Sequence, residues 1–276
     1  MAAAMRFVRR NPTMTIGALI LLIVMVLAIA APLFAGDPVS MRPAQRLRPP
    51  SAANWLGTDH LGRDVFARTI FGAQVSLYVG IAVSVLSIVM GLAIGLLAGY
   101  FRKADAVVMR LMDGLMAIPG ILLAIALVAL TRASVTVVIF AITIPEVPRV
   151  VRLVRAVVLS VREAPYVEAA VSSGTPVWKI LLRHILPSTI APLIVQATYI
   201  CASAILIEAS LSFLGAGTPP EVPTWGNMIA QSRLFLSRAP WTIFAPGIAL
   251  ALVVLAVNLL GDGLRDRLDP RLARRM

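Results

Sequence analysis

The sequence is poor in titratable and metal-binding side chains. Its 276 residues include one cysteine, two histidines and 13 acidic residues, and charged residues make up 14% of the chain. A single cysteine, Cys201, excludes an intrachain disulfide and says nothing about the redox compartment. The histidines lack the paired spacing of a metal site. Although Asp59 and Asp64 flank the stretch that holds His60, a turn held by hydrogen bonds is the favoured interpretation there.

Nucleotide-binding and hydrolytic motifs are also missing. The lysines are Lys103 and Lys179, and neither follows a glycine-rich turn as the lysine of a P-loop does. Ser172, Ser173 and His184 lie in a polar loop, and the sequence gives no argument for a cleft around them. We therefore predict that the chain is not an enzyme and that it holds no catalytic residue, metal or cofactor.

Hydrophobic residues dominate instead, at 59% of the chain. So much apolar surface cannot be hidden in one soluble core, so we predict an integral membrane protein whose solvent is lipid. The formal net charge is +12, and the arginines stand between apolar runs. That distribution favours cytoplasmic loops and anionic lipid head groups over nucleic acid as the partners of the basic residues.

Apolar runs long enough to cross a bilayer recur along the chain. At about 1.5 Å per residue, an uncharged helical run such as 14–34 spans a hydrocarbon layer of about 30 Å. We predict an all-α integral membrane protein with six transmembrane helices, at residues 14–34, 74–101, 111–130, 134–151, 189–214 and 241–260. A kink is expected at Pro119-Gly120, and Pro145 and Pro148 are expected to interrupt the fourth span.

The second apolar run contains glycines at a regular spacing. Gly91, Gly95 and Gly99 stand four residues apart. Small residues at this spacing let another helix approach closely in a membrane. We therefore expect the second span to pack tightly against a neighbour.

Basic residues set the predicted topology. The segments placed inside hold 17 lysines and arginines and those placed outside hold 8, so both termini are predicted to be cytoplasmic. In the external loop, Asp64 is expected to cap a helix that begins at Val65. The predicted divisions are a tail with the first helix (1–35), an external loop (36–73), a five-helix core (74–264) and a cytoplasmic tail (265–276).

Residues 150–188 form a polar, basic interruption between two apolar runs, and we predict a cytoplasmic loop of two short helices. Pro165 suits the first turn of one helix, and Gly174 supplies a left-handed stop. Thr175 is expected to cap the second helix, and Pro187 is expected to end it. By pattern alone, this loop is either a docking segment for a soluble partner or an amphipathic segment on the membrane surface.

The spacing within the loop resembles a known motif. Glu168-Ala169-Ala170, then Gly174, then His184-Ile185-Leu186-Pro187 is similar to the EAA loop of ABC-importer permease subunits. His184 stands where the broad family favours an aliphatic residue and the peptide-transporter branch often has histidine. Further stretches resemble the C-type permease subunit of dipeptide and oligopeptide ABC importers: residues 55–59, 62–64, 118–125, 208–215, 225–228 and 260–266.

The resemblance implies an ABC type I importer permease in the cytoplasmic (inner) membrane of a bacterium. Its partners would be a second permease subunit, two ATP-binding subunits that carry ATP and Mg²⁺, an extracytoplasmic substrate-binding protein and membrane lipid, with no nucleic acid. The loop that couples to the ATPase would use Tyr166, Glu168, Ala169, Ala170, Gly174, Trp178, His184 and Pro187.

The cargo implied is a di- or oligopeptide, with glutathione, opines and nickel chelates as alternatives. Glu208, near the outer end of the fifth span, and Ser212 are candidates for a translocation path, and pairing of Glu208 with a neighbouring helix is the alternative. Two other classes are weighed against the importer. A stand-alone secondary transporter would need coupling-ion ligands near mid-membrane and internal repeats, and we find neither. A non-transporting scaffold would use the same loop to recruit a soluble protein.

Overall fold

The structure is a computed structural model that describes residues 11–268. Within that range every regular element is a helix, and the only strand-like pairing is an isolated bridge between Thr58 and Asp64. In chain order the elements are α2 (Pro12–Phe34), η1 (Pro43–Gln45), α3 (Val65–Tyr100), α4 (Arg102–Met116), α5 (Gly120–Ala129), α6 (Val135–Val161), α7 (Pro165–Ser172), α8 (Val177–Lys179), η2 (Ile180–Ile185), α9 (Leu186–Phe213), α10 (Trp225–Ser232), η3 (Arg233–Phe235) and α11 (Trp241–Leu268). The all-α prediction is confirmed for these residues. The parts of the predicted tails at 1–10, with Arg6, Arg9 and Arg10, and at 269–276 lie outside them.

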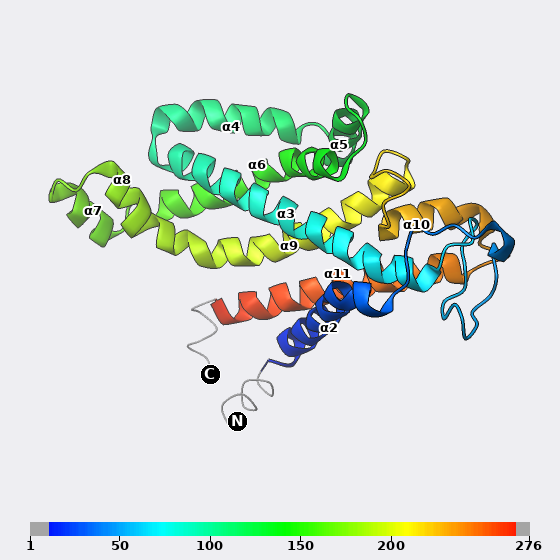
Figure 1. Ribbon diagram of the computed structural model, residues 1–276. Coiled ribbons are helices and arrows are strands. Elements are labelled where there is room, and N and C mark those ends of the chain that lie inside the picture. Colours follow the sequence, from blue (N-terminus) through cyan, green and yellow to red (C-terminus); the bar gives the residue numbers. More distant parts are fainter. Residues whose placement is uncertain (1–10, 269–276) are drawn as a thin grey trace, which may run out of the picture.

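Three long helices, α3, α6 and α9, pack on one another in the middle of the bundle (Figure 1). Helices α2 and α11 form a pair that contacts α9 and α3, while α4 and α5 lie against α3 and α6. Helices α7 and α8 stand at one end of the bundle, and α10 stands at the opposite end together with the loop that carries η1 (Figure 1). The segment predicted to be cytoplasmic and the loops predicted to be external therefore lie at opposite ends.

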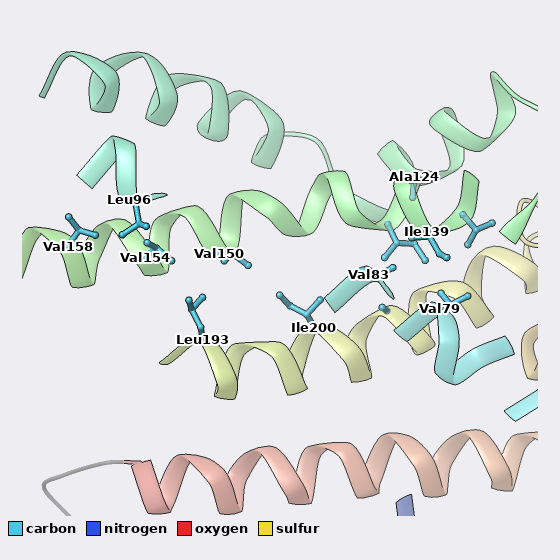
Figure 2. Close-up of a cluster of buried hydrophobic side chains, with 14 of the residues drawn as sticks. Val79, Val83, Leu96, Ala124, Ile139, Val150, Val154, Val158, Leu193 and Ile200 are labelled. Carbon is cyan, nitrogen blue, oxygen red and sulfur yellow. The ribbon is translucent and has the colours of Figure 1, made fainter. Parts of the chain in front are cut away.

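The main core lies between the central helices. Figure 2 shows aliphatic side chains of α3, α6 and α9 in the space between these helices, and all the labelled ones are buried. The backbones of α3 and α6 come very close at Gly91, Gly95 and Gly99, where a Cβ atom at Gly91 would lie 2.4 Å from the Cβ of Val150. The predicted close approach of a second helix at these glycines is confirmed.

Four stretches are long and apolar enough to cross a membrane: α2, α3, the continuous helical stretch Val177–Phe213 and α11. The pair α4 and α5 meets the same criterion only as one bent span, which raises the count to five. Helix α6 is long enough, but Glu146, Arg149 and Arg152 interrupt its apolar character. A multi-pass membrane protein is supported, and the exact count of six spans stays a prediction.

The predicted third span is not one straight helix. Helix α4 already begins at Arg102, before residue 111, where the predicted span starts. The kink falls where it was predicted, at Pro119-Gly120, but it amounts to a bend of 84° between α4 and α5. Helix α4 is held along α6 by two ion pairs. Arg152 Nη2 lies 2.6 Å from Asp113 Oδ1, and Arg155 Nη2 lies 2.7 Å from Asp105 Oδ2.

Helix α6 contradicts the expectation that its prolines would interrupt it. The helix is continuous through Pro145 and Pro148, and it ends at Val161 rather than at residue 151. Its N-terminus is capped by Ser134, whose hydroxyl accepts a hydrogen bond from the backbone N–H of Val137. Neighbouring helices pack closely on this stretch, with Gly120 of α5 against Pro145 and Gly91 of α3 against Val150, and prolines are tolerated in membrane helices that neighbours support.

Helix α3 is one unbroken helix that includes the predicted second span and the turns before it. It begins at Val65 as expected, and Asp64 Oδ1 accepts a hydrogen bond of 2.9 Å from the backbone N–H of Phe66, so the predicted cap is confirmed. The helix then continues without a break to Tyr100. The predicted external segment 36–73 therefore includes the first turns of α3, and its boundary with the membrane span stays a prediction.

Candidate coupling surface

Helix α7 forms the first half of the loop with the predicted signals at both ends. Pro165 occupies the first turn, where its missing N–H leaves no hydrogen bond unmade. The helix ends in a left-handed glycine, Gly174, with φ +75°. The backbone N–H of Gly174 donates to the carbonyl of Val171 (2.9 Å), and that of Thr175 donates to the carbonyl of Ala170 (3.1 Å). These two bonds form a Schellman motif, so the predicted stop is confirmed.

The second half of the loop differs from the prediction. The residue that precedes the first helical turn is Pro176, not Thr175, and α8 begins at Val177. The helix does not end at Pro187 but passes through η2, a π-helical turn, directly into α9. Widening the helix to the i→i+5 pattern, as in the bond from Leu186 N–H to Leu181 O, accommodates the proline ring and its missing N–H.

This π-helical turn has a mechanical consequence. Because α8, η2 and α9 are continuous, one helical stretch runs from Val177 at the loop to Phe213 at the far end of the bundle. The start of the loop is tied to the bundle as well, since Arg162 Nη1 donates a hydrogen bond of 3.2 Å to the carbonyl of Gly99 at the end of α3. Because the loop also follows α6 directly in the chain, it is attached to all three central helices.

One side of the loop is buried against the bundle, and the other side is exposed. Val167, Ile180 and Ile185 are 0–1% exposed and belong to the main core. In contrast, Tyr166 is 50% and Trp178 is 60% exposed. The remaining predicted coupling residues divide into the exposed Glu168, Ala169, Gly174 and Pro187 and the half-buried Ala170 and His184. We call the exposed side of residues 165–187 the coupling surface.

The coupling surface is preformed rather than loose. The hydroxyl of Tyr166 in α7 lies 3.5 Å from the carbonyl oxygen of His184 in η2, and α7 packs against η2. Small residues and Glu168 share α7, while the Trp178 ring lies beneath the Lys179 ammonium at 5.4 Å. Such a mixture of an exposed aromatic ring, small residues and a few charges suits insertion into a groove of a folded protein.

Three exposed apolar side chains of this surface were missed by the sequence reasoning, and one of them is Val177, at 38% exposed. Val171 is 52% and Leu182 is 53% exposed. A signal existed, because each is an apolar residue in a polar loop. However, the side of the helix on which Leu182 lies depends on the π-helical turn, which the sequence did not reveal.

The opposite end of the bundle contains the predicted translocation-path residues. Glu208 has no exposed surface, and its Oε1 accepts a hydrogen bond of 2.9 Å from the Ser212 hydroxyl. The chain that follows α9 folds back closely over this pair, since a Cβ at Gly217 would lie 2.4 Å from Ser212 Cα and one at Gly226 would lie 2.5 Å from Ala209 Cα. The structure therefore brings Glu208 and Ser212 together beneath the second loop that is predicted to be external, and their role in a path stays a prediction.

The turn around His60 is held by hydrogen bonds, as predicted. Asp59 Oδ1 accepts bonds of 2.9 Å from the backbone N–H groups of Leu61 and Arg63, and Gly57 and Gly62 adopt left-handed conformations. His60 stacks on Phe235, with ring centroids 5.5 Å apart. This turn therefore links the loop 36–64, which is predicted to be external, to η3.

The fold defines a class of protein: a membrane protein whose described residues form a bundle of apolar helices, with an exposed helical loop at one end. A solved structure of an inward-facing methionine ABC transporter has a chain with a similar fold, with a TM-score of 0.57 at 19% identity, covering 73% of this chain and 96% of that one. The family described as "binding-protein-dependent transport system inner membrane component" matches residues 87–274. The chain belongs to this family.

Similar proteins cover nearly the whole chain. A protein of Sinorhizobium fredii, named a probable peptide ABC transporter permease, is 60% identical over 98% of this chain and 93% of its own length. A dipeptide transport system permease of Alkalihalophilus pseudofirmus is 42% identical over 98% of this chain and 89% of its own length. A glutathione transport system permease of Pectobacterium atrosepticum is 42% identical over 97% of this chain and 89% of its own length.

Proposed function

We propose that this chain is the permease subunit of an ABC importer that moves di- or oligopeptides across the inner membrane of a bacterium, driven by ATP hydrolysis on separate subunits. The observation that carries this proposal is the exposed, preformed coupling surface at one end of a bundle of apolar helices. The relatives named for peptides and dipeptides support the cargo class. Glutathione, itself a small peptide, is the alternative that the third relative supports, whereas opines and nickel chelates rest on the resemblance alone.

In the proposed mechanism, closure of two ATP-binding subunits pushes on α7 and α8, and the loop acts as a lever. The Schellman motif at Gly174 fixes the angle between α7 and α8. The continuous stretch from α8 to α9 then transmits the displacement to the outer end, where Glu208 and Ser212 lie beneath the second loop. Such transmission requires a rigid element that moves between two discrete arrangements. The rigid joint at Gly174 and the unbroken helix after it would provide that element.

The remaining partners in the proposal are a second permease subunit, which completes the pathway, and an extracytoplasmic substrate-binding protein. We place the substrate-binding protein at the end of the bundle opposite the coupling surface, where the loop 36–64 and helix α10 lie (Figure 1). Both termini are proposed to be cytoplasmic, and ATP and Mg²⁺ to be bound by the partner subunits. The chain itself contributes no catalytic group in this scheme.

The lever is tested by two substitutions in the coupling surface, Glu168→Arg and Gly174→Asp. We expect both to abolish ATP-coupled peptide uptake and co-purification of the ATPase while the protein still inserts into the membrane. Glu163→Arg, a charge reversal on an exposed side chain outside the motif, and Gly36→Asp, which adds a charge to an exposed glycine with open surroundings, are the matched controls and should transport normally. Normal uptake by both loop variants would reject the lever.

Co-purification separates the rival classes. The importer predicts a complex with an ATPase pair and a second permease. A chain that moves solute in a proton gradient without these partners would identify a secondary transporter. Recruitment of a soluble protein without any uptake would identify a scaffold.

A second part of the proposal is that Glu208 faces the translocation path in a conformation open to cargo. What supports it is the cost of an ionisable side chain in a membrane helix, which makes such a residue a candidate for function. Glu208→Gln retains the size of the side chain and an acceptor for the Ser212 hydroxyl, so it isolates the charge. We expect reduced uptake with unchanged protein levels. Full uptake would mean that Glu208 serves only to hold α9.

A further inference from the structure

Helix α6 carries an ion pair near the middle of the bundle. Arg149 Nη1 lies 3.1 Å from Glu146 Oε2. The Glu146 side chain is 6% exposed and has Ser203 of α9 as a neighbour, whereas the Arg149 side chain is 57% exposed. The carboxylate is therefore enclosed between helices, while the guanidinium that it pairs with lies at the surface of the chain.

Neighbouring helices show how deep this pair lies. Val150, the residue after the arginine, packs on Gly91, which is nine residues before the end of α3 at Tyr100. Ser203 is ten residues before the end of α9 at Phe213, and the two helix ends lie at opposite ends of the bundle (Figure 1). At about 1.5 Å per residue, the pair is about 14 Å from one end and about 15 Å from the other. Because α3 and α9 are long and apolar enough to cross a membrane, we place the pair near the middle of a hydrocarbon layer of about 30 Å.

The helical backbone breaks at the same depth. Residues 117–119 separate α4 from α5, and the stretch 116–120 is exposed. A Cβ atom at Gly120 would lie 3.3 Å from the side chain of Pro145, the residue before Glu146. Lipid cannot pair the free backbone groups at a helix break. Non-helical backbone is therefore tolerated at this depth only where it is enclosed by protein or lines a water-filled cavity.

Arg149 shares the side of α6 that faces this break. Pro145, Arg149 and Arg152 follow one another at intervals of four and three residues, so they lie on one face of the helix. Pro145 contacts the start of α5, and Arg152 Nη2 lies 2.6 Å from Asp113 Oδ1 of α4, with both of these charged side chains exposed. Charged side chains are costly in lipid. This face of α6 therefore borders water or another protein chain rather than lipid.

The guanidinium of Arg149 has donors that the pair does not use. A guanidinium offers five N–H donors. Within residues 11–268, that of Arg149 makes one hydrogen bond, to Glu146. Its planar fork matches the two oxygens of a carboxylate. Every peptide with a free C-terminus carries a carboxylate, so a single arginine on the path can bind such cargo without contacting the peptide's side chains.

We propose that Arg149 binds the C-terminal carboxylate of the peptide cargo in the middle of the translocation path, and that Glu146 positions the guanidinium for this contact. The inference rests on the proposed function, since it assigns the cargo of the importer a contact on this chain. The pair carries no net charge without cargo, which lowers the cost of keeping Arg149 at this depth. A zwitterionic peptide adds no net charge when it binds.

Uptake of a dipeptide by the complete transporter in liposomes, with its binding protein and ATP, provides the first test. Arg149→Gln should lower the maximal uptake rate about tenfold or more, the effect of losing a hydrogen bond between charged groups. Peptide binding by the isolated binding protein should not change. Arg149→Lys retains a positive charge and should retain part of the uptake. Arg102→Gln, a loss of charge at an exposed arginine where α4 begins, is the matched control and should transport normally.

A peptide with an amidated C-terminus separates cargo binding from a purely structural role. With the binding protein fully loaded with either form, the wild type should move the acid about tenfold faster than the amide. Arg149→Gln and the double variant with Glu146→Gln should move both forms slowly and equally. Equal rates for the two forms in the wild type, or normal uptake by the double variant, would overturn the inference and leave the proposed function intact. A wild-type complex that moves no peptide would instead reject the proposed function.

Cysteine accessibility tests the same face without changing Arg149. In a Cys201→Ala background, Ala117→Cys places a thiol at the exposed break, and Val89→Cys places one on an exposed part of α3 two residues from Gly91. We expect a charged, membrane-impermeant thiol reagent to modify Ala117→Cys in the assembled transporter and to leave Val89→Cys unmodified. No reaction of Ala117→Cys in any nucleotide state would overturn the inference that the path runs along this face.

Discussion

The contact between α3 and α6 makes a quantitative prediction at Gly91. A Cβ atom there would lie 2.4 Å from Val150 Cβ and 2.5 Å from Val150 Cγ1, roughly 1 Å short of ordinary van der Waals contact. Gly91→Ala therefore forces the two helices apart or strains Val150. Overpacking of this kind costs about 1–3 kcal/mol of unfolding free energy.

The control removes the effect of helix propensity. Gly247 in α11 is also helical, but a Cβ atom there would meet nothing within 4 Å. Gly247→Ala should be neutral or should stabilise by up to about 1 kcal/mol. The unfolding free energy is measured by titrating SDS into mixed micelles and following helicity by circular dichroism.

A double mutant identifies the clash itself. Val150→Gly removes the two nearest atoms that a Cβ at residue 91 would meet and leaves the backbone N of Val151 at 3.3 Å, so Gly91→Ala with Val150→Gly should show a favourable coupling free energy of about 1 kcal/mol or more. If Gly91→Ala proves as stable as Gly247→Ala, the close packing of α3 on α6 is not what holds these helices together.

The remaining predictions concern the ion pairs of α4 and the pH response of the turn around His60. Asp105→Asn removes the charge that binds Arg155 through two hydrogen bonds. Because the two side chains are about a quarter to a third exposed, we expect a loss of about 1 kcal/mol of unfolding free energy, and a smaller loss for the more exposed Asp113→Asn. Equal losses in SDS unfolding would be inconsistent with this ranking. Burial lowers the pKa of His60 from 6.5, so the unfolded chain binds its proton first and folding stability is lost as pH falls below about 6.5. His60→Phe should retain the stack on Phe235 and show a weaker loss of melting temperature between neutral and acidic pH, whereas an unchanged pH profile would mean that His60 does not contribute.

Local signals in the sequence were sufficient for much of the coupling surface. A proline favours the first turn of a helix, and a glycine that adopts a left-handed conformation ends one. Both effects involve only neighbouring residues, so the roles of Pro165 and Gly174 could be predicted without the rest of the structure. The same holds for Asp64, whose cap involves a donor two residues away. The apolar runs were found for a similar reason, since length and composition suffice to identify a candidate span.

The errors share a physical cause, which is that tertiary packing overrides a local rule. Pro145, Pro148 and Pro187 all suggested the end of a helix, yet each lies within a continuous helical stretch. Neighbouring helices support the first two, and a π-helical turn accommodates the third. Only the geometry around each proline decides between a break and an adjustment.

Long-range pairs could not be predicted either. The ion pair between Asp105 and Arg155 joins residues 50 positions apart, and that between Asp113 and Arg152 joins residues 39 positions apart. In the sequence these arginines are basic residues of a predicted inner segment. Their partners become visible only when α4 is seen to run back along α6 (Figure 1).

Site-directed cross-linking tests the central claim most directly, namely that residues 165–187 contact the ATPase subunits. In a Cys201→Ala background, Ser172→Cys places a thiol on the exposed coupling surface, and Ala52→Cys places one on the exposed loop at the opposite end. We predict that, in the assembled transporter, only Ser172→Cys forms a cross-link to an ATP-binding subunit and that its yield changes with bound nucleotide. A cross-link to that subunit from Ala52→Cys, or none from Ser172→Cys in an assembly that hydrolyses ATP, would contradict the account.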